Sequence, residues 1–221
     1  MGLSFDTPPV IVTPSGTTRA AVLWLHGLGA SGDDFPPALP LLQLPDDHGI
    51  AFHFPHAPIR PVTLNNGYAM RAWYDLYGLD FNTPPDQAGI HSSVAYVHDW
   101  LREQETSGLP RERLFIAGFS QGGAIALQAG LAQANLCGGI IALSTYLPLP
   151  EEVVPSNTPI FLAHGTYDDV IPLHVAERAF DQLNHRHPNP EHIHWETWPM
   201  AHNITPEEFQ TLGQWLMARV D

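Results

Sequence analysis

The segment Leu114-Phe115-Ile116-Ala117-Gly118-Phe119-Ser120-Gln121-Gly122-Gly123 joins an apolar run to a serine that stands between glycines. The run has the composition of a buried strand, and the residues from Ala124 to Gln133 have that of a helix. Gly-x-Ser-x-Gly between a strand and a helix is typical of a sharp turn that presents a serine hydroxyl clear of the backbone. Glycines two residues before and after Ser120 avoid a side-chain clash in such a turn. This segment therefore predicts Ser120 as a nucleophile.

Further apolar runs on both sides of this segment are short enough to be strands, and they alternate with stretches of helical spacing. Such alternation with short connections predicts an α/β fold with a mostly parallel central sheet and helices on both faces. We expect strands at residues 10–12, 20–25, 51–54, 114–117, 138–143, 159–163 and 192–198, and helices at 86–105, 124–133, 173–183 and from 205 onward.

The length of 221 residues suits one buried core and is short for two, so residues 1–221 are expected to form a single domain. Only residues 144–158 separate the strands expected at 138–143 and 159–163. Because this connection is too short for an inserted cap domain, we expect an open site.

The composition excludes several classes of function. A net charge of -14 disfavours nucleic acid and anionic membrane surfaces as partners. The chain contains no lysine, which excludes pyridoxal-phosphate enzymes and P-loop NTPases. Its single cysteine, Cys137, excludes an internal disulfide and a cysteine-based zinc site. We expect no cofactor.

The sequence also carries signals about localisation. Residues 1–6 lack the basic start and apolar core of a signal peptide, and Asp6 stands where a myristoylation signal needs Ser or Thr. No run approaches the roughly 18 apolar residues of a membrane span. A cytoplasmic protein without stable membrane insertion is therefore expected.

Two further loops carry residues that could activate a serine hydroxyl. Asp168 and Asp169 follow the strand expected at 159–163, and His202 follows the last expected strand. Parallel sheets place their ligands at this edge, and the order Ser…Asp…His suits a hydrolytic triad. His202 would accept the serine proton, and an aspartate would orient the imidazole. The residues alone leave both aspartates as candidates.

The stretch His26-Gly27-Leu28-Gly29 directly follows the strand expected at 20–25. Glycines at this place let the backbone approach a substrate, and an N–H group there can be one donor of an oxyanion hole. The N-terminus of the helix after Ser120 can supply the other donor.

Residues 55–85 are the least regular part of the sequence, and within them residues 72–79 are rich in aromatic and apolar side chains. A loop of this length in a compact domain is usually functional or has minor structure of its own. Its apolar part is either a wall for substrate or a small hydrophobic cluster under a loop. Both interpretations stay open.

Six blocks together resemble the carboxylesterase, lysophospholipase and acyl-protein thioesterase family of α/β-hydrolases. The resemblance covers nearly the whole chain, with the blocks in the family's order and spacing. The blocks are His26-Gly27-Leu28-Gly29, Val62-Thr63-Leu64-Asn65 through Met70-Arg71-Ala72-Trp73-Tyr74-Asp75, Gly118 to Gly123, Leu143-Ser144-Thr145-Tyr146-Leu147-Pro148, His164-Gly165 to Pro172, and Met200-Ala201-His202.

The resemblance implies the α/β-hydrolase fold and assigns roles to the candidate residues. It implies a triad of Ser120, Asp168 and His202, and an oxyanion hole made by the N–H groups of Leu28 and Gln121. It favours Asp168 over Asp169 because the family's acid stands four residues after the histidine of a His-Gly pair. It also suggests a homodimer.

These observations predict a serine carboxylesterase that hydrolyses short-to-medium acyl esters through an acyl-enzyme intermediate. The alternative is an acyl-protein thioesterase or a lysophospholipase. Tyr146 stands where some thioesterase members have tryptophan, so the preferred acyl group stays open. The expected substrate-binding residues are Trp73, Leu76, Tyr77, Leu79 and Tyr146.

Three other interpretations have weaker support. The histidines His185, His187, His192 and His194 suggest a metal site, but no cysteine or well-placed carboxylate joins them, so we expect a solvated cluster and no metal. A dienelactone hydrolase needs cysteine at the turn, whereas Cys137 lies elsewhere. A non-catalytic binding module would have a broken triad or oxyanion loop, and both are intact.

Overall fold

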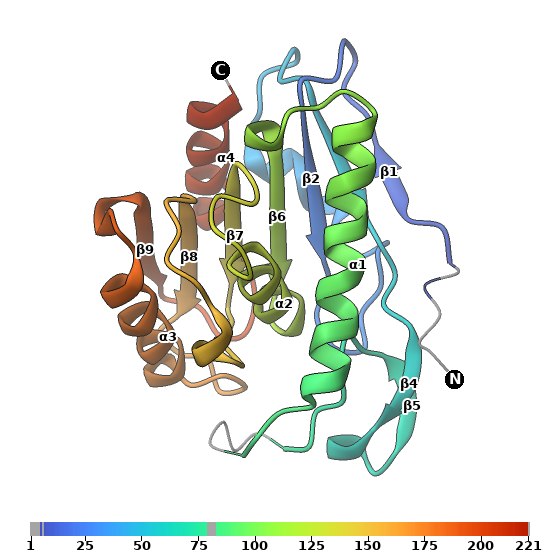
Figure 1. Cartoon of the computed structure of the whole chain (residues 1–221), viewed down its shortest axis with the longest axis vertical. Coiled ribbons are helices and arrows are strands. Elements are labelled where there is room, and N and C mark those ends of the chain that lie inside the picture. Colours follow the sequence, from blue (N-terminus) through green and yellow to red (C-terminus); the bar gives the residue numbers. More distant parts are fainter. Residues whose placement is uncertain (1–4, 6, 79–82, 221) are drawn as a thin grey trace.

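The computed structural model describes residue 5, residues 7–78 and residues 83–220. Within these residues a seven-stranded sheet has the order β1-β3-β2-β6-β7-β8-β9 (Figure 1). Neighbouring strands run parallel except β1, which pairs antiparallel with β3 at one edge. This confirms the predicted, mostly parallel sheet. The strands are β1 (Val10–Val12), β2 (Ala20–Leu25), β3 (Ile50–Phe54), β6 (Leu114–Phe119), β7 (Gly139–Leu143), β8 (Ile160–Gly165) and β9 (Ile193–Trp198).

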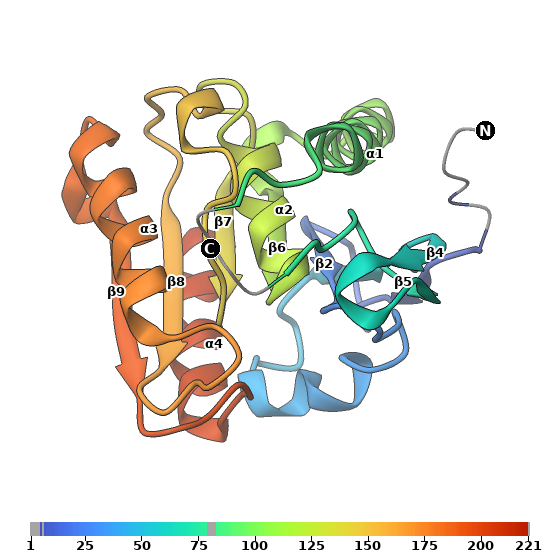
Figure 2. The ribbon, with the colours of Figure 1, turned by 90° about the horizontal axis from the view of Figure 1, so that it is seen from below.

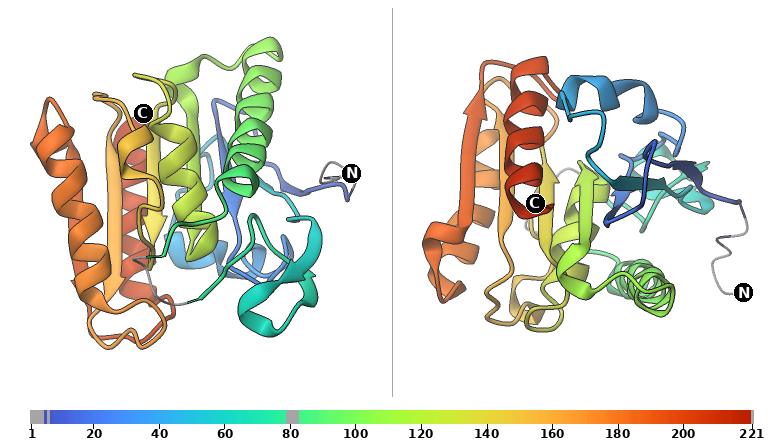
Figure 3. Two further views of the ribbon diagram at one scale, coloured as in Figure 1. Left: turned by 60° about the horizontal axis from the view of Figure 1, so that its bottom comes forward. Right: turned by 90° about the horizontal axis from the view of Figure 1, so that it is seen from above.

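Helices cover both faces of the sheet, as the sequence predicts (Figures 2 and 3). Three of them pack on one face, and α4 packs on the other with a short 3-10 helix at Pro36–Leu42. None of the helices in the described ranges is long and apolar enough to cross a membrane. The helices are α1 (Gln87–Thr106), α2 (Gln121–Gly130), α3 (Leu173–Arg186) and α4 (Pro206–Val220).

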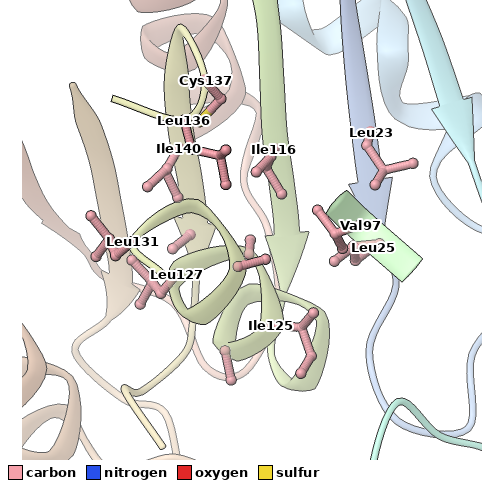
Figure 4. Close-up of a cluster of buried hydrophobic side chains, with 14 of the residues drawn as sticks. Leu23, Leu25, Val97, Ile116, Ile125, Leu127, Leu131, Leu136, Cys137 and Ile140 are labelled. Carbon is pink, nitrogen blue, oxygen red and sulfur yellow. The ribbon is translucent and has the colours of Figure 1, made fainter. Parts of the chain in front are cut away.

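Strand β2 illustrates why both faces need cover. All six of its residues are at most 1% exposed. Leu23 and Leu25 point to the cluster beneath α1 and α2, shown in Figure 4, whereas Trp24 contacts Phe209 of α4 on the opposite face. A strand that is apolar throughout is stable in water only when both of its faces are covered.

Cys137 lies in the same cluster as Leu23 and Leu25 (Figure 4). Its thiol is buried, and this burial raises the pKa of Cys137 to about 12. The side chain therefore behaves as a small apolar core group.

Helix α2 begins at Gln121, three residues earlier than the sequence suggests. The expected start was later because Gly122 and Gly123 disfavour a helix. The structure shows why glycine stands at position 122: the start of α2 lies so close to the end of β2 that a Cβ atom on Gly122 would overlap the carbonyl oxygen of Leu25. Replacing this glycine would force α2 away from β2.

The connection between β7 and β8 is short and holds only a 3-10 turn at Pro150–Glu152 within residues 144–159. No cap domain is inserted there, as expected. Residues 55–78 contain minor structure of their own, a hairpin of β4 (Ile59–Val62) and β5 (Tyr68–Arg71). The hairpin lies at the edge where the strands of the main sheet end, at the bottom of Figure 1.

Candidate active site

Ser120 stands at the turn between β6 and α2 in a backbone conformation that side chains rarely adopt, with φ of 54° and ψ of -121°. Two hydrogen bonds to the end of β7 and the residues just after it hold the turn. The Ser120 N–H donates to the Leu143 carbonyl oxygen at 2.9 Å, and the Thr145 hydroxyl donates to the Ser120 carbonyl oxygen at 2.6 Å. A Cβ atom on Gly118 would overlap the backbone of Gly122. The strained turn thus depends on glycine at positions 118 and 122.

The structure brings Ser120, His202 and Asp168 into one line of hydrogen bonds. The Ser120 Oγ atom lies 2.9 Å from His202 Nε2, and His202 Nδ1 lies 2.7 Å from Asp168 Oδ2. Because a carboxylate only accepts hydrogen bonds, Nδ1 carries the proton and Nε2 is free to accept from the serine hydroxyl. This is the geometry that a general base needs.

Asp168 is the aspartate that reaches His202, as the resemblance implies. Its side chain is 0% exposed, and its Oδ1 atom accepts hydrogen bonds from the N–H groups of Val170 and Ile171 at 2.9 and 2.8 Å. Asp169 points to solvent. The turn at 168–171 therefore fixes the carboxylate, because both of its oxygens have partners.

His164 also touches this carboxylate, and sequence reasoning missed it. Its Nε2 atom donates to the Ile171 carbonyl oxygen at 2.8 Å and lies 3.3 Å from Asp168 Oδ2. Burial lowers the pKa of His164, so the ring is neutral at neutral pH. In the sequence, His164 served only to locate Asp168 four residues later. This short separation was the one signal that the two side chains could touch.

The loop after β2 is held by His26. Its Nδ1–H donates to the Gly27 carbonyl oxygen at 2.7 Å, and its Nε2 accepts from the Ala57 N–H at 3.0 Å. Burial lowers the pKa of His26 to about 4, which keeps the ring neutral. Leu28, whose N–H was predicted as an oxyanion donor, lines the cleft beside Ser120.

Gln121, the other predicted oxyanion donor, occupies the first position of α2. The first N–H groups of a helix have no intrahelical acceptor, so this one is available to a ligand. Gln121 is 3% exposed, and its side chain binds the backbone of the segment that follows β5. The Oε1 atom accepts from the Trp73 N–H at 2.9 Å, and Nε2 donates to the Tyr74 carbonyl oxygen at 2.8 Å.

A cleft of about 490 Å³ opens over Ser120 and His202. Most of its lining is apolar. Leu76 and Tyr146 belong to it, as predicted, and so do several side chains that the sequence did not single out. These further residues are Phe35, Leu64, Phe119, Val170, Ile171 and Ile204.

Two of the predicted substrate-binding residues lie elsewhere. Trp73 is 0% exposed, and its indole N–H donates to the His26 carbonyl oxygen at 2.8 Å, so it supports the loop from beneath. Tyr77 is half exposed and lines a neighbouring pocket, which shares Leu76 and Tyr146 with the cleft. Leu79 lies outside the described residues.

The histidines near α3 and β9 do not all form the solvated cluster that the sequence predicts, because His187 is buried. His187 donates to the Thr158 carbonyl oxygen at 3.0 Å and accepts from the Asn189 N–H at 3.1 Å, which engages both of its nitrogens. His194 stacks on Phe161 at a centroid distance of 4.7 Å. In the described part of the chain, no group of three or more His, Cys, Asp or Glu residues is placed to hold a metal ion.

Comparison with known families gives the decisive observation: the phospholipase/carboxylesterase family model matches residues 7–219. The chain belongs to this family. It is therefore a hydrolase with the α/β-hydrolase fold, as the resemblance implies.

Relatives of known name are acyl hydrolases. Acyl-protein thioesterase 1 of Neurospora crassa is 36% identical over 96% of this chain and 92% of its own length. A probable carboxylesterase of Oryza sativa subsp. japonica is 31% identical over 95% of this chain and 81% of its own length.

Two solved structures are similar to this chain over most of its length. Acyl-protein thioesterase 2 of Zea mays is 28% identical with a TM-score of 0.81, covering 96% of this chain and 99% of the maize chain. SOBER1 of Arabidopsis thaliana is 29% identical with a TM-score of 0.83, covering 92% of this chain and all of that protein. These relatives indicate acyl esters or thioesters as the substrates of the family.

Proposed function

We propose that this protein is a serine hydrolase that removes acyl groups from thioesters, with oxygen esters as further substrates. The observation that carries the proposal is the line of hydrogen bonds from Ser120 through His202 to Asp168 beneath an apolar cleft. The sequence alone favours oxygen esters. The thioester alternative has the better support, because several relatives, including those of Neurospora crassa and Yarrowia lipolytica, are named acyl-protein thioesterase 1.

In the first step of the proposed reaction, Ser120 Oγ attacks the carbonyl carbon while His202 Nε2 takes the hydroxyl proton. The negative charge that develops on the substrate oxygen lies at the N–H groups of Leu28 and Gln121. Asp168 stabilises the imidazolium that forms, since its Oδ2 atom accepts from His202 Nδ1.

The intermediate then collapses, and the carbon–sulfur or carbon–oxygen bond breaks as His202 returns the proton to the leaving thiol or alcohol. A water molecule attacks the acyl-enzyme in the second half of the reaction, with His202 again as the base. The products are a carboxylic acid, the free thiol or alcohol, and regenerated Ser120.

The cleft sets the expected acyl preference. Leu28, Leu76 and Tyr146 offer apolar surface next to Ser120. Each buried methylene contributes about 0.8 kcal/mol at most, and an open groove realises less. We therefore propose a preference for short-to-medium acyl chains, with little gain beyond a few carbons.

A fluorophosphonate probe and a matched substrate series test the proposal. The probe should label Ser120, and Ser120→Ala should lower kcat by about 10⁶-fold, as removal of a serine nucleophile does in serine hydrolases. S-acyl and O-acyl substrates with the same acyl group should then be compared at several chain lengths. Labelling at another residue would overturn the mechanism. A higher kcat/KM for O-acyl substrates throughout would return the assignment to a carboxylesterase.

A further inference from the structure

Among the described residues that line the cleft, Asp34 is the one that carries a carboxylate. Asp34 is exposed at the rim. Its Oδ2 atom accepts the Ser31 N–H at 2.7 Å, which holds the carboxylate at the end of the loop that follows β2. Among the described residues that line the cleft, none is arginine.

The cleft has two sides that belong to different cores. Leu76 and Tyr146 pack against the core beneath α1, α2 and α3. Phe35, Phe119 and Ile204 pack against the core beneath α4. The scissile bond at Ser120 would therefore lie between two distinct walls.

Asp34 is joined to the side that carries His202 through the next residue in the chain, Phe35. The ring of Phe35, its neighbour in sequence, lies 6.0 Å from the ring of Phe119, which lies 4.8 Å from the imidazole of His202. Because His202 must deliver a proton to the departing atom, the leaving group occupies this side and the acyl chain the other.

We propose that Asp34 selects substrates by the charge of the leaving group. Thiols or alcohols that carry an ammonium or guanidinium group are favoured, neutral ones follow, and anionic ones are disfavoured. This inference rests on the proposed function and specifies the substrate class of the same site.

The charges around the loop support this direction. Arg71 is half-buried, donates to the Ala57 carbonyl oxygen at 2.9 Å and does not line the cleft. Asp33 adds a second exposed carboxylate next to Asp34, and the chain as a whole has a net charge of -14. A cation that approaches His202 along the wall formed by Phe35 and Phe119 is therefore attracted by these carboxylates, whereas an anion is repelled.

Three thioesters with one acyl group isolate this effect. Butyrylthiocholine carries a cation, S-(3,3-dimethylbutyl) thiobutyrate replaces its nitrogen by carbon, and the S-butyryl ester of 2-mercaptoethanesulfonate carries an anion. The rate of thiol release gives kcat/KM for each. Ratios between substrates within one enzyme preparation do not depend on the fraction of folded enzyme, so a partly unfolded variant stays informative.

The expected ratios follow from the charge. Two unit charges about 6 Å apart, in a medium between water and a protein surface, change kcat/KM by about three- to tenfold. Wild type should prefer the cationic over the neutral thioester by this factor and discriminate similarly against the anionic one. In Asp34→Asn, which retains an acceptor for the Ser31 N–H, both preferences should shrink to about twofold or less. Salt at about 1 M should weaken them in the wild type.

Asp33→Asn is the matched control, because it removes the same charge one residue away and outside the cleft. Its ratios should stay within about twofold of the wild type. Equal rates for all three thioesters in the wild type, or ratios that Asp34→Asn leaves unchanged, would overturn the proposal. Equal effects of the two variants would overturn the assignment to Asp34. If wild type hydrolysed none of these three thioesters and none of the S-acyl and O-acyl substrates of the series proposed above, the proposed function itself would be wrong.

Discussion

The amide side chain of Gln121 and the backbone N–H of Trp73 are joined by a hydrogen bond of 2.9 Å. The same amide donates to the Tyr74 carbonyl oxygen. The residue that follows the nucleophile is thus tied to the loop that supplies Leu76 to the cleft. From the sequence, only the backbone N–H of Gln121 has a predicted role, so replacing the side chain by that of alanine should keep much of the activity provided the loop holds its shape.

The structure shows that the shape of this loop depends on the Gln121 side chain itself. Gln121→Ala would leave a buried N–H of Trp73 and a buried carbonyl oxygen of Tyr74 without partners, and each costs about 1–3 kcal/mol. We expect a lower midpoint of thermal unfolding and a loss of kcat/KM of at least about tenfold. Calorimetry and ester hydrolysis measure the two effects. A variant with normal stability and activity would show that the loop holds without this side chain.

The pair Asp168 and Asp169 tests the proposed base. Asp168→Asn should lower kcat by about 10⁴-fold, because an amide at this place favours the wrong imidazole tautomer. Asp169→Asn removes the same charge from an exposed neighbour and should stay near wild type. Steady-state kinetics on one ester decide between them. If Asp169→Asn were the damaging change, Asp168 would not be the partner of His202.

His164 should act as a positioning residue through Asp168. His164→Phe removes the donor to the Ile171 carbonyl oxygen and loosens the turn that holds the carboxylate, so we expect kcat to fall by about tenfold. His164→Gln can restore a donor and should recover part of the loss, which a change of core volume alone would not explain. The two variants should be compared by kcat and KM separately. An equal loss of kcat in His164→Phe and His164→Gln would assign the effect to packing.

Glu208 in α4 should make stability depend on pH. Its side chain is 0% exposed, and burial raises the pKa of Glu208 to about 8 from its ordinary value of 4.5. The folded state therefore binds a proton that the unfolded state releases between these values, and stability falls as pH rises from about 4.5 to about 8. The carboxylate that forms at higher pH would be buried with its Oε1 atom unpaired.

Glu208→Gln removes this titration. Relative to wild type, its midpoint of thermal unfolding should rise by several degrees at pH 8.5 and change little at pH 4.5. The difference between the two proteins cancels the titration of the other groups. If the difference in unfolding midpoint between Glu208→Gln and wild type were the same at both pH values, Glu208 would not be a buried ionisable group.

Strands β2 and β6 are predictable because their apolar runs are continuous, which both faces of a parallel sheet require. Ser120, His202 and the pair Asp168 and Asp169 could be named because each follows a strand, and parallel strands end at one edge. The choice of Asp168 came from the family resemblance. The single domain and the homodimer stay predictions.

The walls of the cleft are harder to predict. Residues 72–78 have no regular period, so nothing in the sequence tells that Trp73 points inward while Leu76 lines the cleft. Phe35 and Ile204 reach the cleft from loops far apart in the chain, and only the packing of α4 against the sheet brings them together. His164 was missed because its partners depend on the path of the 168–171 turn.

The burial of Cys137 has a practical consequence for chemical labelling. With that thiol protonated and enclosed, thiol reagents find no accessible target in the native protein. A Ser120→Cys variant would therefore carry one reactive sulfur, and titration with a thiol reagent should count one group per chain. Fluorophores, spin labels or acyl donors could then be attached at the cleft floor alone, without first removing a native cysteine.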